Sequence, residues 1–282
     1  MGKPPRELLI FLPDRKASAR IGNFVKFKHH ALSTLINKPE TLYIVYELQT
    51  AKSLFREVFK LNPDGLRVYF ASFKVVEDYE NIDDPSFNND LIPPGMEDNL
   101  TLIFAPTRKN QYDIQVDTKD YFITDPNGQI VNLKNYGDPF IASRWVRHFT
   151  EIKWPVLTAI IQETEKDKYE TKSILYDIKV IRDLKENFID EQTPQTLPAL
   201  AMYFATYHLH ETEERDIHKN NQSGKLTLVL SFLDKYRRFY YYQNKDENDP
   251  QVMAFGGGGS GDTGVPCPPP NPPQTCSGTS LP

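Results

Sequence analysis

The chain has 282 residues, of which 33 are Lys or Arg and 38 are Asp or Glu, so its formal net charge is −5. Hydrophobic residues make up 39% of the chain and charged residues 25%, which is typical of a globular protein and excludes disorder of the whole chain. Since no excess of positive charge is available to neutralise a phosphate backbone, nucleic acid is not expected as a partner.

Targeting and redox features favour a reducing compartment. No apolar run approaches the roughly 20 residues that span a bilayer, and the apolar residues 8–12 are too few for the core of a signal peptide. Both cysteines, Cys267 and Cys276, lie near the C-terminal end, so the predicted folded body has neither a disulfide nor a thiol nucleophile. We expect a cytoplasmic protein without a membrane partner, and export without a signal peptide is left open.

The first predicted elements are a helix and a strand. Residues 43–60 carry apolar side chains at three- and four-residue spacing, namely Ile44, Leu48, Ala51, Phe55 and Val58, and this spacing predicts an amphipathic helix. The sequence Asn-Pro-Asp-Gly at residues 62–65 ends this helix, because proline cannot continue a helix and glycine permits a turn. Residues 66–73 are rich in Val, Tyr and Phe without a helical period, which predicts a strand.

More strands follow in the first half of the chain. Residues 100–104, 112–116 and 121–124 have strand-like composition, and Asp-Pro-Asn-Gly at residues 125–128 predicts a tight turn before a strand at residues 130–133. These segments together predict a meander.

The second half of the chain begins with two predicted helices. They cover residues 140–152 and 154–161, and Pro155 suits the first turn of the second helix. A further helical stripe consists of Ile174, Ile178, Ile181, Leu184 and Phe188. Strands are then expected at residues 200–207, 225–233 and 236–242.

The order of these elements repeats along the chain. Residues 40–48 match residues 170–178 at an offset of 130, residues 66–73 match residues 200–207 at an offset of 134, and residues 100–104 match residues 226–230 at an offset of 126. Matches in the same order, with offsets that change only in the connecting segments, favour a duplication. The alternative is that buried helix-strand segments resemble one another through their apolar pattern alone.

These observations predict an α+β fold. An antiparallel or mixed sheet covered by helices would consist of two diverged helix-strand-strand repeats. The first unit would span residues 1–137 and the second residues 138–242, packed together as one body. Residues 243–282 are predicted to be a disordered tail, because 7 of these 40 residues are Gly and 8 are Pro.

The tail is also the expected contact with a protein partner. Cys267, Pro268, Pro269, Pro270 and Cys276 lie in a segment whose prolines favour an extended polyproline II conformation that a partner can bind. An inert end is the first alternative. A metal or redox role for the two thiols is the second, although two cysteines do not complete a zinc site.

Catalytic motifs are missing from the sequence: neither a phosphate-binding glycine loop nor a zinc-hydrolase or nucleophile-elbow pattern is present. The best candidate for chemistry is a metal set of His208, His210 and Glu211, which follows the second-half strand. A solvated acidic loop with incidental histidines is the alternative. Catalytic residues and cofactors are therefore not expected from the sequence.

Other charged segments have two interpretations. Acidic residues are concentrated at residues 77–84 and 211–216, where they would bind a divalent cation or a basic partner, or form a solvated surface. A second polar group, consisting of Arg144, Arg147, His148 and Glu151, is expected on the exposed face of the helix at residues 140–152. Tyrosines 240–242 could stack on bases, although a position in a sheet fits the negative net charge better.

Two strand motifs carry a family resemblance. Gly-Leu-Arg-Val-Tyr-Phe-Ala at residues 65–71, Leu-Thr-Leu-Ile-Phe-Ala-Pro-Thr at residues 100–107 and the Cys-Pro-Pro tail together resemble a group of uncharacterised bacterial proteins. The resemblance implies a related fold and no known activity. In the second half of the chain, Ala199 and Ala201 replace Gly65 and Arg67.

The functional expectation from the sequence is a non-enzymatic protein-binding or adaptor protein. The tail, the acidic loops or both would contact another protein. The alternative is a metal-assisted hydrolase or other enzyme centred on His208, His210 and Glu211.

Overall fold

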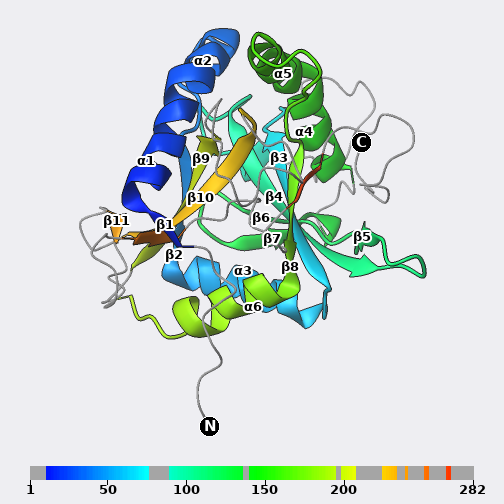
Figure 1. The fold of residues 1–282 in the computed structure, drawn as a ribbon. Helices are drawn as coiled ribbons and strands as arrows, with labels where there is room; N and C mark the ends of the chain where they lie inside the picture. The colour runs from blue at the N-terminus through cyan, green and yellow to red at the C-terminus, as the bar shows by residue number, and fades with distance from the viewer. Residues whose placement is uncertain are drawn as a thin grey trace.

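The fold is α+β, with antiparallel sheets covered by helices, as predicted (Figure 1). The computed structural model describes residues 11–75, 89–135, 140–194, 198–207, 224–233, 239–240, 251–253 and 265–267. In this part of the chain, no helix has the length and apolar character needed to cross a membrane.

The first half of the chain provides the following elements in order: β1 (Phe11–Pro13), α1 (Asp14–Asn23), the π-helical segment η1 (Phe24–His29), α2 (His30–Ile36), β2 (Tyr43–Glu47), α3 (Leu48–Lys60), β3 (Gly65–Ser72), η2 (Asn89–Leu91), β4 (Leu100–Lys109), β5 (Gln115–Asp117), β6 (Phe122–Thr124), β7 (Ile130–Asn132) and η3 (Leu133–Asn135). The predicted strands are present, but β5 and β6 both pair with β4, so the meander runs through β4, β6 and β7 and leaves β5 aside. The turn before β7 has Gly128 at a φ of 76°. Asp125 O accepts a hydrogen bond from Gly128 N at 3.0 Å, which closes this turn.

The second half repeats much of this order. Its elements are α4 (Ile141–His148), the π-helical segment η4 (Phe149–Lys153), α5 (Trp154–Gln162), β8 (Ser173–Asp177), α6 (Ile178–Leu184), the π-helical segment η5 (Lys185–Ile189), β9 (Ala199–Thr206), β10 (Leu226–Leu233) and β11 (Phe239–Tyr240). Within the predicted tail, β12 (Gln251–Met253) and β13 (Val265–Cys267) are short strands that pair with the body. The other tail residues lie outside the described part of the chain.

Each half contributes one strand to the sheet of the other half. The four-stranded sheet has the order β11-β10-β9-β2, and the seven-stranded sheet has the order β13-β8-β3-β4-β6-β7 with β5 paired to β4. Thus β2 of the first half pairs with β9 of the second half, whereas β8 of the second half pairs with β3 of the first half. The two predicted units therefore share both sheets.

The two exchanged pairings have the same register. Glu47 lies opposite Ala199 in one sheet, and Asp177 lies opposite Gly65 in the other. The strand pairs β3–β4 and β9–β10 also agree, because Ser72 pairs with Leu100 and Thr206 pairs with Leu226. We call residues at equivalent positions of the two halves counterparts.

The predicted start of each repeat is wrong. Residues 43–47 and 173–177 are strands, and the helices begin only at Leu48 and Ile178. A spacing of four residues between Ile44 and Leu48 suits a helix, but it is equally compatible with a strand that leads into a helix. Residues 43–47 and 173–177 form strands because they pair with β9 and β3. The start of α6 is then fixed by the Asp177 side chain, which caps the helix by accepting a hydrogen bond from Lys179 N at 2.7 Å. Each half is therefore strand-helix-strand-strand.

A helical arm precedes each of these units. The first arm consists of α1, η1 and α2, which the sequence patterns did not predict, and the second consists of α4, η4 and α5. Figure 1 shows the two arms on opposite flanks of the sheets, with α3 and α6 side by side at the other end. Helix α1 packs on β9 and α4 packs on β3, so the arms also occupy equivalent positions.

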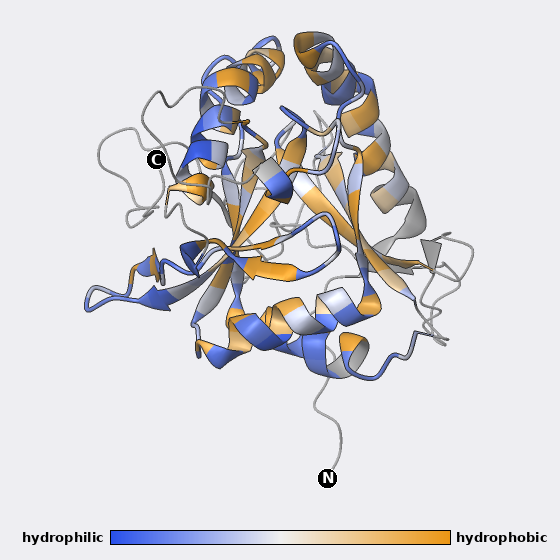
Figure 2. Ribbon diagram, turned by 180° about the vertical axis from the view of Figure 1, so that it is seen from behind, coloured by the Kyte–Doolittle hydropathy of each residue, from blue (hydrophilic) through white to orange (hydrophobic). Residues whose placement is uncertain are grey.

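The main hydrophobic core contains residues of both sheets, of α3 and α6, and of both arms. At its centre is a row of four fully buried phenylalanines, Phe24, Phe204, Phe70 and Phe149, whose successive ring centroids lie 5.9, 6.1 and 6.1 Å apart. Two of these residues come from π-helical segments and two from central strands. Figure 2 shows hydrophobic strands in the interior, whereas the projecting β4–β5 hairpin is hydrophilic. The row of rings therefore joins the two halves through their centre.

Gly65 provides a test of how closely the exchanged strand packs. A Cβ atom at this position would lie 2.8 Å from Thr107 Oγ1 and 3.0 Å from Tyr176 O. We therefore expect Gly65→Ala to lower the free energy of unfolding by about 1–3 kcal/mol, measured by urea denaturation. The counterpart Ala199→Gly is the control and should cost at most about 1 kcal/mol through added backbone freedom. A neutral Gly65→Ala would contradict the close packing.

Candidate functional site

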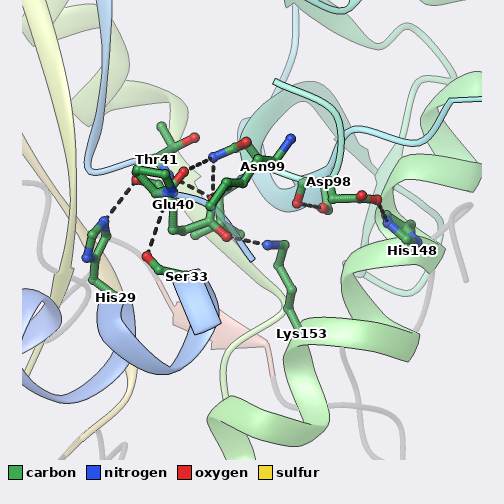
Figure 3. A network of polar contacts seen from close by, with 12 residues as sticks. His29, Ser33, Glu40, Thr41, Asp98, Asn99, His148 and Lys153 are labelled. Carbon is green, nitrogen blue, oxygen red and sulfur yellow. Dashed lines mark hydrogen bonds and ion pairs between the residues drawn. The ribbon is translucent and has the colours of Figure 1, made fainter. Parts of the chain in front are cut away.

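Two buried ion pairs connect the helical arms to the exchanged strands. Lys28 of η1 contacts the carboxylate of Glu170, which lies just before β8. Lys153 of η4 contacts Glu40, which lies just before β2, as Figure 3 shows. All four side chains are at most 1% exposed, and each pair joins a lysine of one half to a glutamate of the other.

The glutamates also bind the backbone. Glu40 Oε1 accepts hydrogen bonds from Thr41 N and Leu100 N, both at 2.7 Å. In the other half, Glu170 Oε1 accepts from Thr171 N and Leu226 N, both at 2.6 Å. Each carboxylate thus connects the approach to an exchanged strand with the first residue of β4 or β10. Charge-assisted bonds of this kind are stronger than neutral ones.

Each arm also holds the glutamate of its own half. Glu170 O accepts a hydrogen bond from Trp154 Nε1 at 3.0 Å, and Thr158 Oγ1 accepts one from Glu170 N at 3.2 Å. The counterpart contacts are His29 Nε2 to Glu40 O at 2.9 Å, and Glu40 N to Ser33 Oγ at 3.0 Å. Because a carbonyl oxygen only accepts, Nε2 of His29 carries the proton, as Nε1 of the tryptophan does. We use the name latches for the two equivalent sets of contacts around Glu40 and Glu170. Each latch consists of the ion pair with a lysine of the other half, the hydrogen bonds that the carboxylate accepts, and the hydrogen bonds between the glutamate backbone and its own arm.

Burial lowers the pKa of Lys28 and Lys153, because a charged ammonium loses its solvation in the interior, and the glutamate that each contacts opposes this effect. A buried pair of this kind adds little net stability compared with a hydrophobic replacement. The larger energetic effect arises when one partner is removed, because the other charge then stays buried without compensation. The latches therefore position β2 and β8 and have no free reactive group.

The outer edge of β8 is paired with the tail. Val265 of β13 lies opposite Leu175, and Cys267 lies opposite Ser173. Phe70 N donates to Lys172 O at 3.0 Å on the β3 side, so alternate residues, Ser173 and Leu175, direct their backbone groups toward β13.

This register accommodates a proline in the tail strand. Pro266 lies opposite Ile174, whose backbone groups face β3. The ring nitrogen of Pro266 therefore points away from β8, and the pairing loses no hydrogen bond through its missing N–H. A strand in which proline alternates with other residues fits this edge.

Among the described residues, a second buried polar cluster is found in the first half and has no equivalent in the second. Arg67 Nε lies 3.4 Å from Asp117 Oδ1, and the Tyr69 hydroxyl donates to Asp117 Oδ2 at 2.6 Å. Burial raises the pKa of Asp117, although the charge of Arg67 opposes this. Ala201 takes the place of the arginine in the other half. The cluster connects β5 to β3, and all three side chains are buried. Its role is therefore structural.

His148 and Asp98 form a partly exposed pair in which His148 Nε2 lies 2.8 Å from Asp98 Oδ1 (Figure 3). Asp98 has a φ of 61°, and its counterpart Gly224 has a φ of 74°. An aspartate in this conformation is strained relative to glycine. The counterpart of His148 is Asn23, so only the second arm carries this contact.

The sequence-predicted site residues are mostly outside the described residues. This applies to His208, His210 and Glu211, to the acidic residues 77–84 and 211–216, and to Pro268, Pro269, Pro270 and Cys276. Cys267 is described through its backbone, as part of β13. In the described ranges, no group of three or more His, Cys, Asp or Glu side chains is arranged to hold a metal ion.

Sequence patterns alone did not predict the latches. Phe-x-x-x-Lys occurs at residues 24–28 and again at residues 149–153, and Glu-Thr occurs at residues 40–41 and 170–171. A charged residue repeated at the edge of an apolar repeat was the available signal. The pairing between the two halves could not be predicted from the sequence, because each lysine contacts a glutamate more than 100 residues away.

Comparison of the chain with protein-family models, with curated proteins and with solved structures gives no match in any of the three. The resemblance to uncharacterised bacterial proteins stays a prediction.

Removal of one latch charge should destabilise the fold strongly. We expect Lys28→Met to lower the free energy of unfolding by about 3–5 kcal/mol, because the Glu170 carboxylate stays buried without its partner. Urea denaturation measures the loss. The double variant Lys28→Met/Glu170→Gln should recover part of it, since both charges are then absent.

The matched control for the latch is Lys60→Met. Lys60 lies 2.7 Å from Glu57 on the exposed face of α3, so this replacement should cost at most about 0.5 kcal/mol. Equal losses in Lys28→Met and Lys60→Met would contradict a role of the latch in holding β8.

His148 should make stability depend on pH. Burial lowers its pKa from the ordinary 6.5, although Asp98 favours the charged ring, and Lys74 and Lys153 add to the lowering. Because the unfolded state then binds more protons, stability is full above pH 6.5 and is lost as the pH falls through the lower folded pKa.

The replacement of His148 by Asn, the residue at the counterpart position, should reduce the difference in urea midpoint between about pH 5 and pH 7. His30→Asn, at an exposed position on α2, should keep the difference of the unchanged protein. An unaltered difference in His148→Asn would exclude this histidine as the cause.

Proposed function

We propose that this chain is a non-enzymatic protein-binding or adaptor protein that takes up an extended segment along the outer edge of β8. The observation that carries the proposal is the antiparallel pairing of Val265–Cys267 with β8. In this arrangement the tail is the occupant supplied by the chain itself, and a partner with a similar extended segment competes for the same edge.

The edge suits this role because it is held rigidly. The latch through Glu170 fixes the approach to β8, and β3 pairs with the inner side of the strand. An ordered edge loses little conformational freedom when a peptide adds to it. Backbone hydrogen bonds then provide affinity without requiring one particular sequence, as in other cases of strand addition.

The tail is the part of the chain that would let the protein act as an adaptor. Residues 254–282 contain a glycine-rich stretch followed by the proline-rich segment that enters β13. Release of β13 from β8 would present the same segment to another protein. The acidic segments at residues 77–84 and 211–216 are further proposed contact surfaces.

The alternative function is a metal-assisted enzyme centred on His208, His210 and Glu211. Its support is the spacing of these residues in the sequence alone. Metal analysis of the purified full-length chain, with and without added Zn²⁺, tests it, and the absence of bound or bindable ion would exclude it.

The binding proposal is tested at Leu175. Leu175→Pro removes the N–H that faces β13, whereas the inner pairing with β3 does not use this group. In the full-length chain, we expect the Cys267 amide to exchange its hydrogen at least about tenfold faster in this variant, since one to two backbone bonds contribute roughly 1.4 kcal/mol.

The control variant is Val45→Pro at the counterpart position on β2. Phe204 N donates to Leu42 O at 3.0 Å, so Val45 likewise faces away from its partner strand. This variant should leave exchange at Cys267 unchanged. A Cys267 amide that exchanges at the rate of an unfolded chain in the unaltered protein would overturn the proposal.

A further inference from the structure

An aromatic patch lies where the tail leaves β13. It consists of Trp154, Tyr169 and Lys172. The rings of Trp154 and Tyr169 are stacked, with an interplanar angle of 3° and centroids 5.9 Å apart, and Lys172 Nζ lies 5.1 Å from the Trp154 ring. Tyr169 is 42% exposed, so the patch reaches the surface. Partial burial lowers the pKa of Lys172.

The register of β13 directs the tail toward this patch. Because β13 is antiparallel to β8, the chain that continues past Cys267 follows β8 backward from Ser173 toward Lys172. The next residues are Pro268, Pro269 and Pro270. A polyproline II segment advances about 3.1 Å per residue, so three prolines cover roughly 9 Å.

The patch has the chemistry of a proline-binding surface. Proline rings pack on aromatic faces, and a preformed polyproline II segment loses little entropy on binding. The Trp154 ring is held in place by its hydrogen bond to Glu170 O, which is part of the latch. The stack with Tyr169 fixes the second ring, so the surface is formed before the prolines arrive.

The other half of the molecule provides an internal comparison. The counterparts of Trp154, Tyr169 and Lys172 are His29, Pro39 and Leu42, which form no aromatic stack. Among the described strands, none pairs with the outer edge of β2. The aromatic patch therefore occurs at the one of the two equivalent edges that receives the tail in the described part of the chain.

We propose that the aromatic patch binds Pro268, Pro269 and Pro270 of the same chain, which follow β13 directly in the sequence. The inference rests on the proposed function and specifies its ligand class: a short extended strand followed by consecutive prolines. Partners that compete for the β8 edge would carry the same combination.

The test uses the full-length chain labelled with 5-fluorotryptophan. The protein has 2 tryptophans, so two ¹⁹F resonances are expected, and Trp145→Phe assigns them. The triple replacement of Pro268, Pro269 and Pro270 by Ala should shift the Trp154 resonance. The Trp145 resonance should not move, because this side chain is buried against the other face of the sheet and is 3% exposed.

The matched control removes prolines farther along the tail. Pro272→Ala/Pro273→Ala should leave both resonances in place. If the triple replacement at 268–270 leaves the Trp154 resonance unmoved, or if the control shifts it equally, the patch does not bind these prolines.

A second measurement changes the patch itself. Tyr169→Ala should speed hydrogen exchange of the Cys267 amide about fivefold, the effect of losing one aromatic contact. Tyr112→Ala, which removes a 71% exposed tyrosine near β5, should leave the rate unchanged. An unchanged rate in Tyr169→Ala would contradict the proposal.

The two proposals fail in different ways. If the Cys267 amide is unprotected in the unaltered protein, the pairing of the tail with β8 fails, and the proline site fails with it. If this amide is protected but neither the triple replacement nor Tyr169→Ala has its expected effect, only the proline site fails.

Discussion

The reciprocal burial of two lysine-glutamate pairs is the constraint on which the rest of the structure depends. Each lysine comes from the arm of one half and each glutamate precedes the strand given to the other half. An unpaired charge in this interior would be very unfavourable, and in this arrangement each half supplies the partner for a buried charge of the other half. The ion pairs therefore add to strand pairing in fixing the positions of β2 and β8.

The π-helical segments contribute to the same arrangement. Both η1 and η4 place a fully buried phenylalanine four residues before the latch lysine. A local widening of the helix turns side chains relative to a regular α-helix, and such segments occur frequently at functional sites. Here, the phenylalanine enters the central row of rings while the lysine crosses to the opposite half.

Near-symmetry makes the differences between the halves informative. Contacts that occur twice, such as the carboxylate bonds to Leu100 and Leu226, serve the fold. The tail strand on β8, the aromatic patch beside it and the His148–Asp98 pair are each described in one half only. Function is best sought among such unmatched features, because the counterpart half is folded without them. The edge of β8 joins two of them.

The amino-acid sequence alone determined the α+β class, the strands β3, β4, β9 and β10, and their order in the two halves. These features could be predicted because the spacing of apolar residues along the chain shows which positions of a helix or strand are buried. Only the tertiary structure decided that residues 43–47 and 173–177 are strands, since Ile44 fits both a helical stripe and a paired strand and the partner is far away in the chain. The latches could not be predicted from the sequence either. Lys28 and Glu170 pair because both side chains lose water on folding, and the sequence shows that the residues are charged but not that they become buried.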